Sequence, residues 1–288
     1  MGDEATYPLG ESRFRVDHGS DYLAFFRRIG DTVLYLTARD DHSAEGIEGG
    51  SDAGGRRRRP IVATACALLR DVPGAADGGD PVDGERAAAV GGIRPKAWYI
   101  GDLRVAPSHR GRHLSEALFI PVVQPMLARC GSAFAVEMVP TPDAVGRMPR
   151  MVQACRPDLP VAVHRLELWS LSADVARRAW DVISRAHGGP RHATFVDLGG
   201  VKDLRLVPSG EPLRVLHLID RRRLKPGDKE CSAPEEGARH LLCSVTGGAS
   251  RLGETLRAGG EVPFAYALAV HLAMDDNVDW ESLSTAEI

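Results

Sequence analysis

The chain has 288 residues, of which 43% are hydrophobic and 26% are charged, and its formal net charge is -3. This composition excludes a disordered chain, and the length suits one large domain or two of ordinary size. The charge argues against a general nucleic-acid binder, and no apolar run reaches the roughly 18 residues that a membrane span needs. The acidic N-terminus lacks the layout of a secretion signal, so we expect a cytoplasmic protein without membrane contact.

The beginning of the chain predicts a helix followed by two strands. The helix is capped at Ser20 and ended by Gly30. Runs of β-branched and aromatic residues predict strands at 32–41 and 60–72. The polar, glycine-rich segment between these strands is a predicted surface loop. Its four arginines, Arg56 to Arg59, have no aromatic residues among them, which favours a solvated loop over a contact with nucleic acid or an acidic partner.

Residues 97–118 predict a strand, a basic turn and the start of a helix. The strand is apolar and aromatic, and Pro107 ends it because proline has no N–H to donate to a sheet. The turn, SHRGRH, places a glycine among basic residues. Apolar residues then recur at helical spacing, at Leu114, Leu118, Val122 and Met126. Because the first N–H groups of a helix have no internal partner, this arrangement predicts an anion site, with phosphate its commonest ligand.

A buried strand at 132–140 and one short helix complete the first half, and the second half repeats the theme less clearly. There we expect a strand at 161–172 and a helix capped by Asp174. Further strands are expected at ATFVDLGG, LRVLHLID, ARHLLCSVTGG and VPFAYALAVHLAM, with a short helix at SRLGETLRAGG. This last helix and the strand after it are interpreted as mirroring the central helix and strand 132–140. We therefore hypothesise two domains, 1–157 and 158–288, the second a degenerate copy of the first.

At the central strand, turn and helix the sequence resembles the GNAT superfamily of acyl-coenzyme A dependent N-acyltransferases. The family pattern is Arg or Gln, two residues, Gly, one residue, then Gly or Ala, usually after Val-x-Pro. Here Val-x-Pro is intact at 105–107 and Arg110 fills the first position, whereas His113 and Ser115 replace the two small residues. The resemblance implies an α/β fold with a mixed sheet, in the order strand, helix, three strands, helix, strand. It places the coenzyme in a V-shaped gap between the fourth and fifth strands.

The resemblance also implies which residues bind acetyl-CoA, or another acyl-CoA, as co-substrate. Main-chain N–H groups of residues 103–105 would hydrogen-bond the pantetheine arm and the thioester. Residues 110–115 would hold the diphosphate, and Arg110 and Arg112 would add charge-assisted contacts. The predicted coenzyme-binding residues are Leu103, Arg104, Val105, Arg110, Gly111, Arg112, His113, Leu114 and Ser115.

Two carboxylates inside apolar strands are candidates for the general base that takes the proton of the amine. Asp102 and Glu137 each lie where burial would raise a carboxyl pKa toward useful values. Either side chain can instead point to solvent, and Asp102 can pair with Arg104. Many members of the family use a tyrosine in the helix after the fifth strand as general acid. No tyrosine lies between Gly101 and Asp220, so that role is vacant.

The predicted function is N-acyl transfer, in the first place acetyl transfer, from acyl-CoA to a small-molecule amine or a peptide amine. Two alternatives stay open: a non-catalytic acyl-CoA-binding module of the same fold, and an enzyme like the N-acyl amino acid synthases that uses long-chain acyl donors. Singly scattered histidines, and five cysteines without C-x-x-C pairing, predict neither a metal site nor a disulfide framework. No nucleic-acid partner is expected, and a homodimer is left open.

Overall fold

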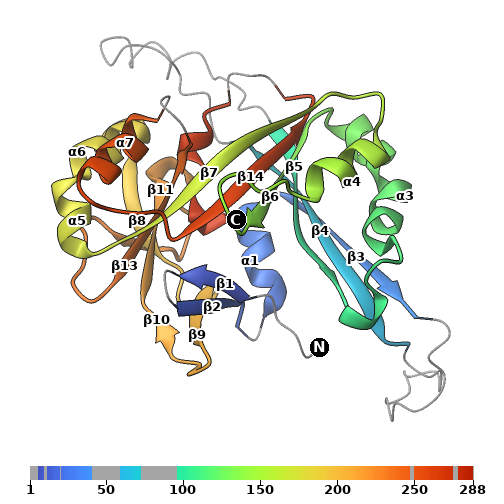
Figure 1. Ribbon diagram of the computed structural model, residues 1–288, viewed down its shortest axis with the longest axis horizontal. Helices are drawn as coiled ribbons and strands as arrows, with labels where there is room; N and C mark the ends of the chain where they lie inside the picture. Colours follow the sequence, from blue (N-terminus) through green and yellow to red (C-terminus); the bar gives the residue numbers. More distant parts are fainter. Residues whose placement is uncertain are drawn as a thin grey trace.

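A mixed sheet of ten strands runs through the described part of the chain (Figure 1). The computed structural model describes residues 6–9, 12–19, 21–40, 59–72, 96–246, 250–274 and 278–287. The strands of this sheet are β3 (Thr32–Arg39), β4 (Ile61–Asp71), β5 (Lys96–Val105), β6 (Ala133–Val139), β7 (Val161–Leu171), β8 (Ala193–Asp197), β11 (Val215–Asp220), β12 (Lys229–Cys231), β13 (Arg239–Val245) and β14 (Ala265–Leu272). Their order, β12-β8-β11-β13-β7-β14-β6-β5-β4-β3, confirms the predicted α/β class with a mixed sheet.

A smaller sheet of four described strands joins the beginning of the chain to its second half. It contains, in spatial order, β1 (Thr6–Leu9), β2 (Ser12–Asp17), β9 (Asp203–Val207) and β10 (Pro212–Leu213). β2 pairs antiparallel with β9, and Phe14 is buried against Leu204 and Val215. The sequence does not predict β1, β9, β10 and β12, because strands of two to five residues are too short to show a clear periodicity.

The described helices gather at the two ends of the large sheet and beneath its middle. They are α1 (Tyr22–Ile29), α3 (Leu114–Arg129), α4 (Met148–Cys155), α5 (Ala173–Arg178), α6 (Trp180–Ala186) and α7 (Arg251–Ala258). α3 and α4 lie at one end of the molecule, and α5, α6 and α7 lie at the other (Figure 1). No helix within the described ranges is long and apolar enough to cross a membrane. The predicted loop with Arg56 to Arg58 lies outside the described residues.

Two predicted helix starts are wrong by one or two residues. Asp21 caps α1 in place of Ser20, and Ser172 caps α5 in place of Asp174; in each case a side-chain oxygen accepts an N–H of the first turn. The single helix predicted after Asp174 is two short helices. Ala179, with φ -90° and ψ 3°, leaves the helical conformation and separates α5 from α6.

The sheet around β5 has two faces that carry different helices. On one face, Phe25 of α1 is buried in a cluster with Tyr99 of β5. On the other face, Leu118 of α3 and Met151 of α4 are buried with Ala135 of β6. We call these the α1 face and the α3/α4 face. Because side chains alternate along a strand, neighbouring residues of β5 belong to opposite faces.

β14 lies between β6 and β7, although β8 to β13 separate it from β7 in sequence. It pairs antiparallel with both neighbours, and Leu268 stands opposite Glu137 on one side and Arg165 on the other. α7 and β14 therefore do not build a neighbouring parallel pair with β13, as a mirror image of the first half would. The large sheet also continues across the proposed division between 1–157 and 158–288, and a second copy of the fold stays a hypothesis.

Two pairs of described strands run parallel, and each pair is joined over three residues only. In the first pair, residues 98–100 of β5 meet 133–135 of β6. In the second, residues 215–217 of β11 meet 239–241 of β13. All four strands continue beyond these residues, so each pair opens into a gap. α3 connects the first pair, as predicted, whereas a 3-10 turn at Arg221–Arg223 and β12 lie between the second.

The gap between β11 and β13 is filled by residues 279–287 of the same chain, which we call the plug. The hydroxyl of Ser284 donates to the carbonyl of Leu218 in β11. The hydroxyl of Thr285 donates to the carbonyl of Leu241 in β13 at 3.3 Å. Both plug side chains are buried. The plug thus replaces the missing strand-to-strand hydrogen bonds in this gap.

A buried ion cluster connects the plug to β4. Glu287 accepts hydrogen bonds from Arg70 at 2.5 Å and from Arg223 at 2.6 Å. The guanidinium of Arg70 also lies over the rings of Tyr99 and Phe134, 5.5 and 5.7 Å from their centroids. These two rings belong to the paired residues of β5 and β6. The plug therefore supports the base of the first gap from the α1 face.

Candidate functional site

β5 carries a bulge directly after the residues that pair with β6. Two residues, Asp102 and Leu103, stand opposite Ala65 of β4, because the register between the strands shifts there. Asp102 takes a left-handed conformation with φ 51°. The extra residue brings Asp102 and Arg104 to the α1 face, while Leu103 and Val105 pack on the α3/α4 face. The bulge is therefore what places a carboxylate and a guanidinium side by side at the mouth of the gap.

The side chain of Asp102 is buried, and both of its carboxylate oxygens are hydrogen-bonded. One accepts the hydroxyl of Tyr22, which α1 brings to it, and the other accepts Nε of Arg104 at 2.6 Å. The Asp102 side chain is 5% exposed and that of Arg104 is 36% exposed. Asp102 does pair with Arg104, and its second carboxylate oxygen is occupied by the hydroxyl of Tyr22.

Three tyrosines lie close to this pair, from three different elements. Burial, followed by the charge of Asp102, raises the pKa of Tyr22 well above its ordinary value. The same two causes raise the pKa of Tyr35 on β3, although hydrogen bonding to Tyr22 lowers it in part. Burial raises the pKa of Tyr7 on β1, which also feels the charges of Arg104 and Asp102. All three are phenols at neutral pH, and Tyr35, which is 39% exposed, links through Tyr22 to Asp102.

The predicted main-chain ligands lie on the open stretch of β5. Leu103, Arg104 and Val105 are half-buried; Arg104 and Val105 pair with β4, and Leu103 lies in the bulge. On the side of β6, pairing in the described part of the sheet stops at Ile100. An unpaired strand edge offers N–H and C=O groups to an extended ligand. The structure thus places these three residues beside the gap, where the resemblance puts the pantetheine arm.

The basic turn follows β5 without interruption. A 3-10 turn at Pro107–His109 leads to Arg110 and Gly111. Gly111 has φ +76°, and a Cβ there would meet nothing within 4 Å, so its conformation, not lack of space, requires glycine. The side chains of Arg110 and Arg112 are exposed and make no hydrogen bond or ion pair with the described residues. Two guanidiniums are therefore available to an anion.

His113 occupies the position of the first motif glycine and takes a left-handed conformation, φ 54° and ψ 28°. Such a conformation costs a non-glycine residue about 1 kcal/mol. The first hydrogen bond of α3 runs from the N–H of Ala117 to the carbonyl of His113 at 3.0 Å. The N–H groups of Leu114, Ser115 and Glu116 precede it and have no helical acceptor. They form the expected helix start beside the basic turn.

A carboxylate of the protein itself lies at this helix start. Glu116 accepts the hydroxyl of Ser115 at 2.9 Å and lies 3.3 Å from Nδ1 of His113. Its own backbone N–H, Ser115 and His113 lower the pKa of the Glu116 carboxyl, against an opposing effect of burial. The N–H groups of Leu114 and Ser115 and the two exposed guanidiniums suit a diphosphate, whereas the carboxylate of Glu116, which already accepts the Ser115 hydroxyl, opposes it.

Glu137, the other candidate base, caps a helix. Its two oxygens accept the N–H groups of Arg147 at 2.8 Å and Met148 at 2.9 Å, at the start of α4. A Cβ at Gly146 would come within 2.2 Å of the same carboxylate, so glycine leaves it the room it needs. The structure brings Asp102, and not Glu137, to the tyrosines. The sequence could not separate the two because both are single acids in apolar strands.

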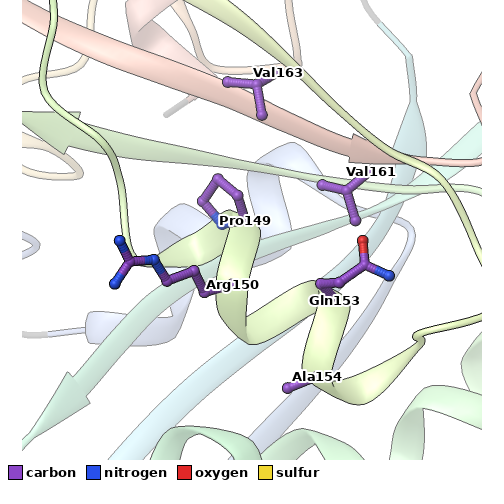
Figure 2. A pocket seen from close by; sticks show the side chains of 6 residues that line it. All are labelled: Pro149, Arg150, Gln153, Ala154, Val161 and Val163. Carbon is purple, nitrogen blue, oxygen red and sulfur yellow. The ribbon is translucent and has the colours of Figure 1, made fainter.

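Two hollows lie on the α3/α4 face of the described structure. One is an apolar cavity of about 50 Å³ beside the last paired residues of β5 and β6, and its lining includes Ile100, Ala135, Met126, Met148 and Met151. The other is open, about 520 Å³, and lies between α4 and the start of β7 (Figure 2); it is lined by Pro149, Arg150, Gln153, Ala154, Val161 and Val163. The open hollow holds no carboxylate, thiol or imidazole, whereas the apolar cavity adjoins the gap.

Two GNAT proteins are among the similar solved structures. One is a tandem GNAT protein from the clavulanic acid biosynthesis pathway, solved without acetyl-CoA; it is 10% identical, the match covers 85% of this chain and 100% of that one, and the TM-score is 0.30. The other is a GCN5-related glucosamine N-acetyltransferase region of a fungal multi-domain GH3 β-N-acetylglucosaminidase; it is 10% identical, with 93% of this chain and 39% of that one covered, at a TM-score of 0.36. No family model matches the chain, and no curated protein matches its sequence. Because both TM-scores are low, these similarities carry no argument about the function of the site. That function depends on the residues described above.

Sequence reasoning missed the tyrosines and Glu116. Tyr22 lies on a helix face with Phe25 and Phe26 and counts there as core. A signal was nevertheless present, because a tyrosine on a buried face needs a partner for its hydroxyl. Which partner it finds depends on how α1 sits against β5, and no local pattern encodes that.

Proposed function

We propose that this chain transfers an acyl group, in the first place acetyl, from acyl-CoA to an amine. One observation carries the proposal: the edge of β5 that no described strand pairs beyond Ile100 runs directly into the basic turn and the start of α3. Acyl-CoA combines an extended arm, which needs main-chain partners along its length, with a diphosphate, which needs an anion site at one end. The bulge with Asp102 lies at the other end of the same strand edge.

The donor would be held by residues of β5, the turn and α3. Leu103, Arg104 and Val105 offer main-chain groups to the pantetheine arm. Arg110 and Arg112 offer two guanidiniums to the phosphates, together with the N–H groups of Leu114 and Ser115 at the start of α3, which have no helical acceptor. The thioester supplies an acyl carbon that a neutral amine can attack.

Asp102 and Tyr22 would move the proton. As the amine nitrogen bonds to the acyl carbon and the C–S bond breaks, one proton leaves nitrogen and one reaches sulfur. Tyr22 takes the proton of the amine while its own hydroxyl proton passes to Asp102. The reverse transfer protonates the thiolate, so both residues return to their starting states. The raised pKa of Tyr22 suits a relay that rests as a phenol.

Calorimetric titration with acetyl-CoA tests the donor site. A micromolar Kd, worth about 8 kcal/mol, is expected for the native sequence. The double variant R110E/R112E should lose at least tenfold in affinity, because it replaces two free cations by anions. Its matched control is R178E/R191E, which changes two exposed arginines in the second half and should bind normally. Unchanged affinity in R110E/R112E would contradict the site.

Release of the CoA thiol in the presence of an amine mixture tests the proton path. D102N should lower kcat by about 10²- to 10⁴-fold without weakening donor binding, and Y22F should lower it by a smaller factor. Y99F is the control, since Tyr99 is buried beneath Arg70 and makes no hydrogen bond to Asp102. A D102N protein with native kcat would remove Asp102 from the mechanism. Tight donor binding with no thiol release from any amine would instead support the non-catalytic module.

The apolar cavity favours a second candidate, transfer of a long acyl chain. It adjoins the gap, and three flexible methionines line it, so it can reshape around an alkyl chain. Titration with acyl-CoAs of two to sixteen carbons separates the two candidates. Affinity that rises with chain length, and falls again in M151W, would favour the long-chain donor; equal affinity at all lengths would favour acetyl transfer.

A further inference from the structure

In the charged pair at the bulge, Asp102 is fully hydrogen-bonded, whereas part of the Arg104 guanidinium is exposed. Within the described part of the chain, Arg104 uses Nε alone, in its bond to Asp102, and its two terminal nitrogens make no hydrogen bond. Its side chain is 36% exposed, against 5% for Asp102. Asp102 therefore fixes the plane of the guanidinium and leaves its outer edge free. That edge is the one that binds a carboxylate with two parallel hydrogen bonds.

The surroundings of the pair favour an ammonium group beside such a carboxylate. Tyr7, Tyr22 and Tyr35 come from three elements, and Asp102 raises the pKa of each. Aromatic rings and phenol oxygens next to a carboxylate attract a cation. The net charge of Asp102 with Arg104 is zero, so a purely cationic acceptor such as a polyamine would meet the guanidinium without a counter-charge. A zwitterion would match both charges.

We propose that the acceptor is a free α-amino acid, whose carboxylate binds the outer edge of Arg104 and whose amino group faces Tyr22 and Asp102. This inference rests on the proposed acyl transfer and names its substrate class. Arg104 then has two roles: its main chain borders the gap, and its side chain selects the acceptor. A peptide amine or a lysine side chain lacks a carboxylate next to the amine and is a poor acceptor.

The test measures thiol release with a panel of free amino acids, each beside its amide and the amine without the carboxyl group. Rates are compared at equal concentrations of neutral amine, because an amide lowers the pKa of the neighbouring amino group. For the best amino acid, kcat/KM should exceed that of its amide by at least 30-fold. Native enzyme that uses amides or simple amines equally well overturns the proposal. This arm needs no variant, so it holds even if a substitution at Arg104 prevents folding.

Variants of Arg104 supply the second arm. R104Q should raise KM for the amino acid by at least tenfold and bring the amino acid and its amide to within threefold of each other. R104K should recover part of the preference, since it restores the charge but not the paired hydrogen bonds. R27Q is the control, an exposed arginine of nearby α1. If R104Q keeps the native preference, Arg104 only neutralises Asp102 and the proposal fails.

Failure of the proposal differs from failure of the proposed function. If amines without a carboxylate are turned over equally well, the proposed amino-acid preference is wrong but the proposed acyl transfer still stands. No thiol release with any acceptor, together with no binding of acetyl-CoA, removes both.

Discussion

The two gaps of the large sheet start from the same backbone arrangement and end differently. β5 with β6, and β11 with β13, each pair in parallel over three residues before the strands separate. The second gap receives Ser284 and Thr285, whose hydroxyls bond to its two strands, and it becomes part of the core. Among the described residues, the first keeps an unpaired strand edge next to a basic turn. Where two parallel strands separate, the gap is thus either filled by the chain itself or left open to a ligand. The polar groups near the gap show which of the two applies.

The largest expected effect comes from breaking the closed gap at Glu287. E287Q leaves Arg70 and Arg223 as buried cations without a counter-charge, and we expect a loss of about 3 to 5 kcal/mol in the free energy of unfolding. Urea denaturation measures it. The control is E236Q, which breaks an exposed pair with Arg177 and should cost under about 1 kcal/mol. A loss of under about 1 kcal/mol in E287Q would show that the plug does not depend on this cluster.

The closed gap also predicts a pH dependence. Lys202 donates to the carbonyl of Thr285 at 2.7 Å, and burial lowers its pKa from 10.5 to about 7. Between these values the unfolded chain binds the proton and the folded one does not, so stability rises with pH and falls as pH drops toward 7. This group contributes a slope of about 1 kcal/mol per pH unit. K202M should flatten urea-derived stability between pH 7 and 9, whereas K229M, at an exposed lysine, should not. Equal slopes in both variants would contradict the assignment.

A smaller effect is expected at the open gap, where Glu116 lies at the start of α3. E116Q removes a negative charge from the proposed diphosphate site and should tighten acetyl-CoA binding by about three- to tenfold, an effect of about 1 kcal/mol. E254Q is the matched control, because Glu254 is an exposed acid in the first turn of α7, at the opposite end of the molecule from α3 (Figure 1). Calorimetry measures both. Weaker binding in E116Q would mean that Glu116 holds the turn in shape for the ligand.

The smallest expected effect concerns His113. H113G relieves a left-handed conformation worth about 1 kcal/mol and adds chain entropy to the unfolded state, so the net gain is about 0.5 kcal/mol. A117G, one turn further into α3, should instead lose about 1 kcal/mol. Thermal unfolding measures whether each variant raises or lowers Tm. A lower Tm for H113G would mean that the contact between His113 and Glu116 outweighs the strain.

Local patterns predicted the parts of the open gap that depend on neighbours in sequence. The strand that Pro107 follows, the glycine turn and the apolar spacing of α3 are all encoded within 97–118, and the structure contains each of them. The bulge was beyond such reasoning, because it depends on the register of β5 against β4. Local patterns also could not show which face of the sheet carries Asp102. That face decides whether the carboxylate can act as a base or is exposed to solvent.

The closed gap was not predictable in this way. Glu287 meets Arg70 across 217 residues of sequence, and a polar C-terminal segment carries no periodicity that signals burial. The helix predicted at 250–260 and the strand predicted at 262–274 are present as α7 and β14, but the position of β14 in the sheet depends on its two partners. Here the local sequence determines whether a segment forms a helix or a strand. Long-range pairing determines which strands are neighbours in the sheet.

The position of β14 sets an order of events during synthesis. β6 and β7 leave the ribosome long before residues 265–272, and until then each presents at least one unsatisfied strand edge to the cell. Val139 can pair only after Tyr266 has been synthesised, and Leu166 only after Ala267 has been. The middle of the sheet cannot form earlier. Pairings of such large sequence separation make folding slow. Production of this protein should therefore depend on translation speed and chaperone supply more than its final stability suggests.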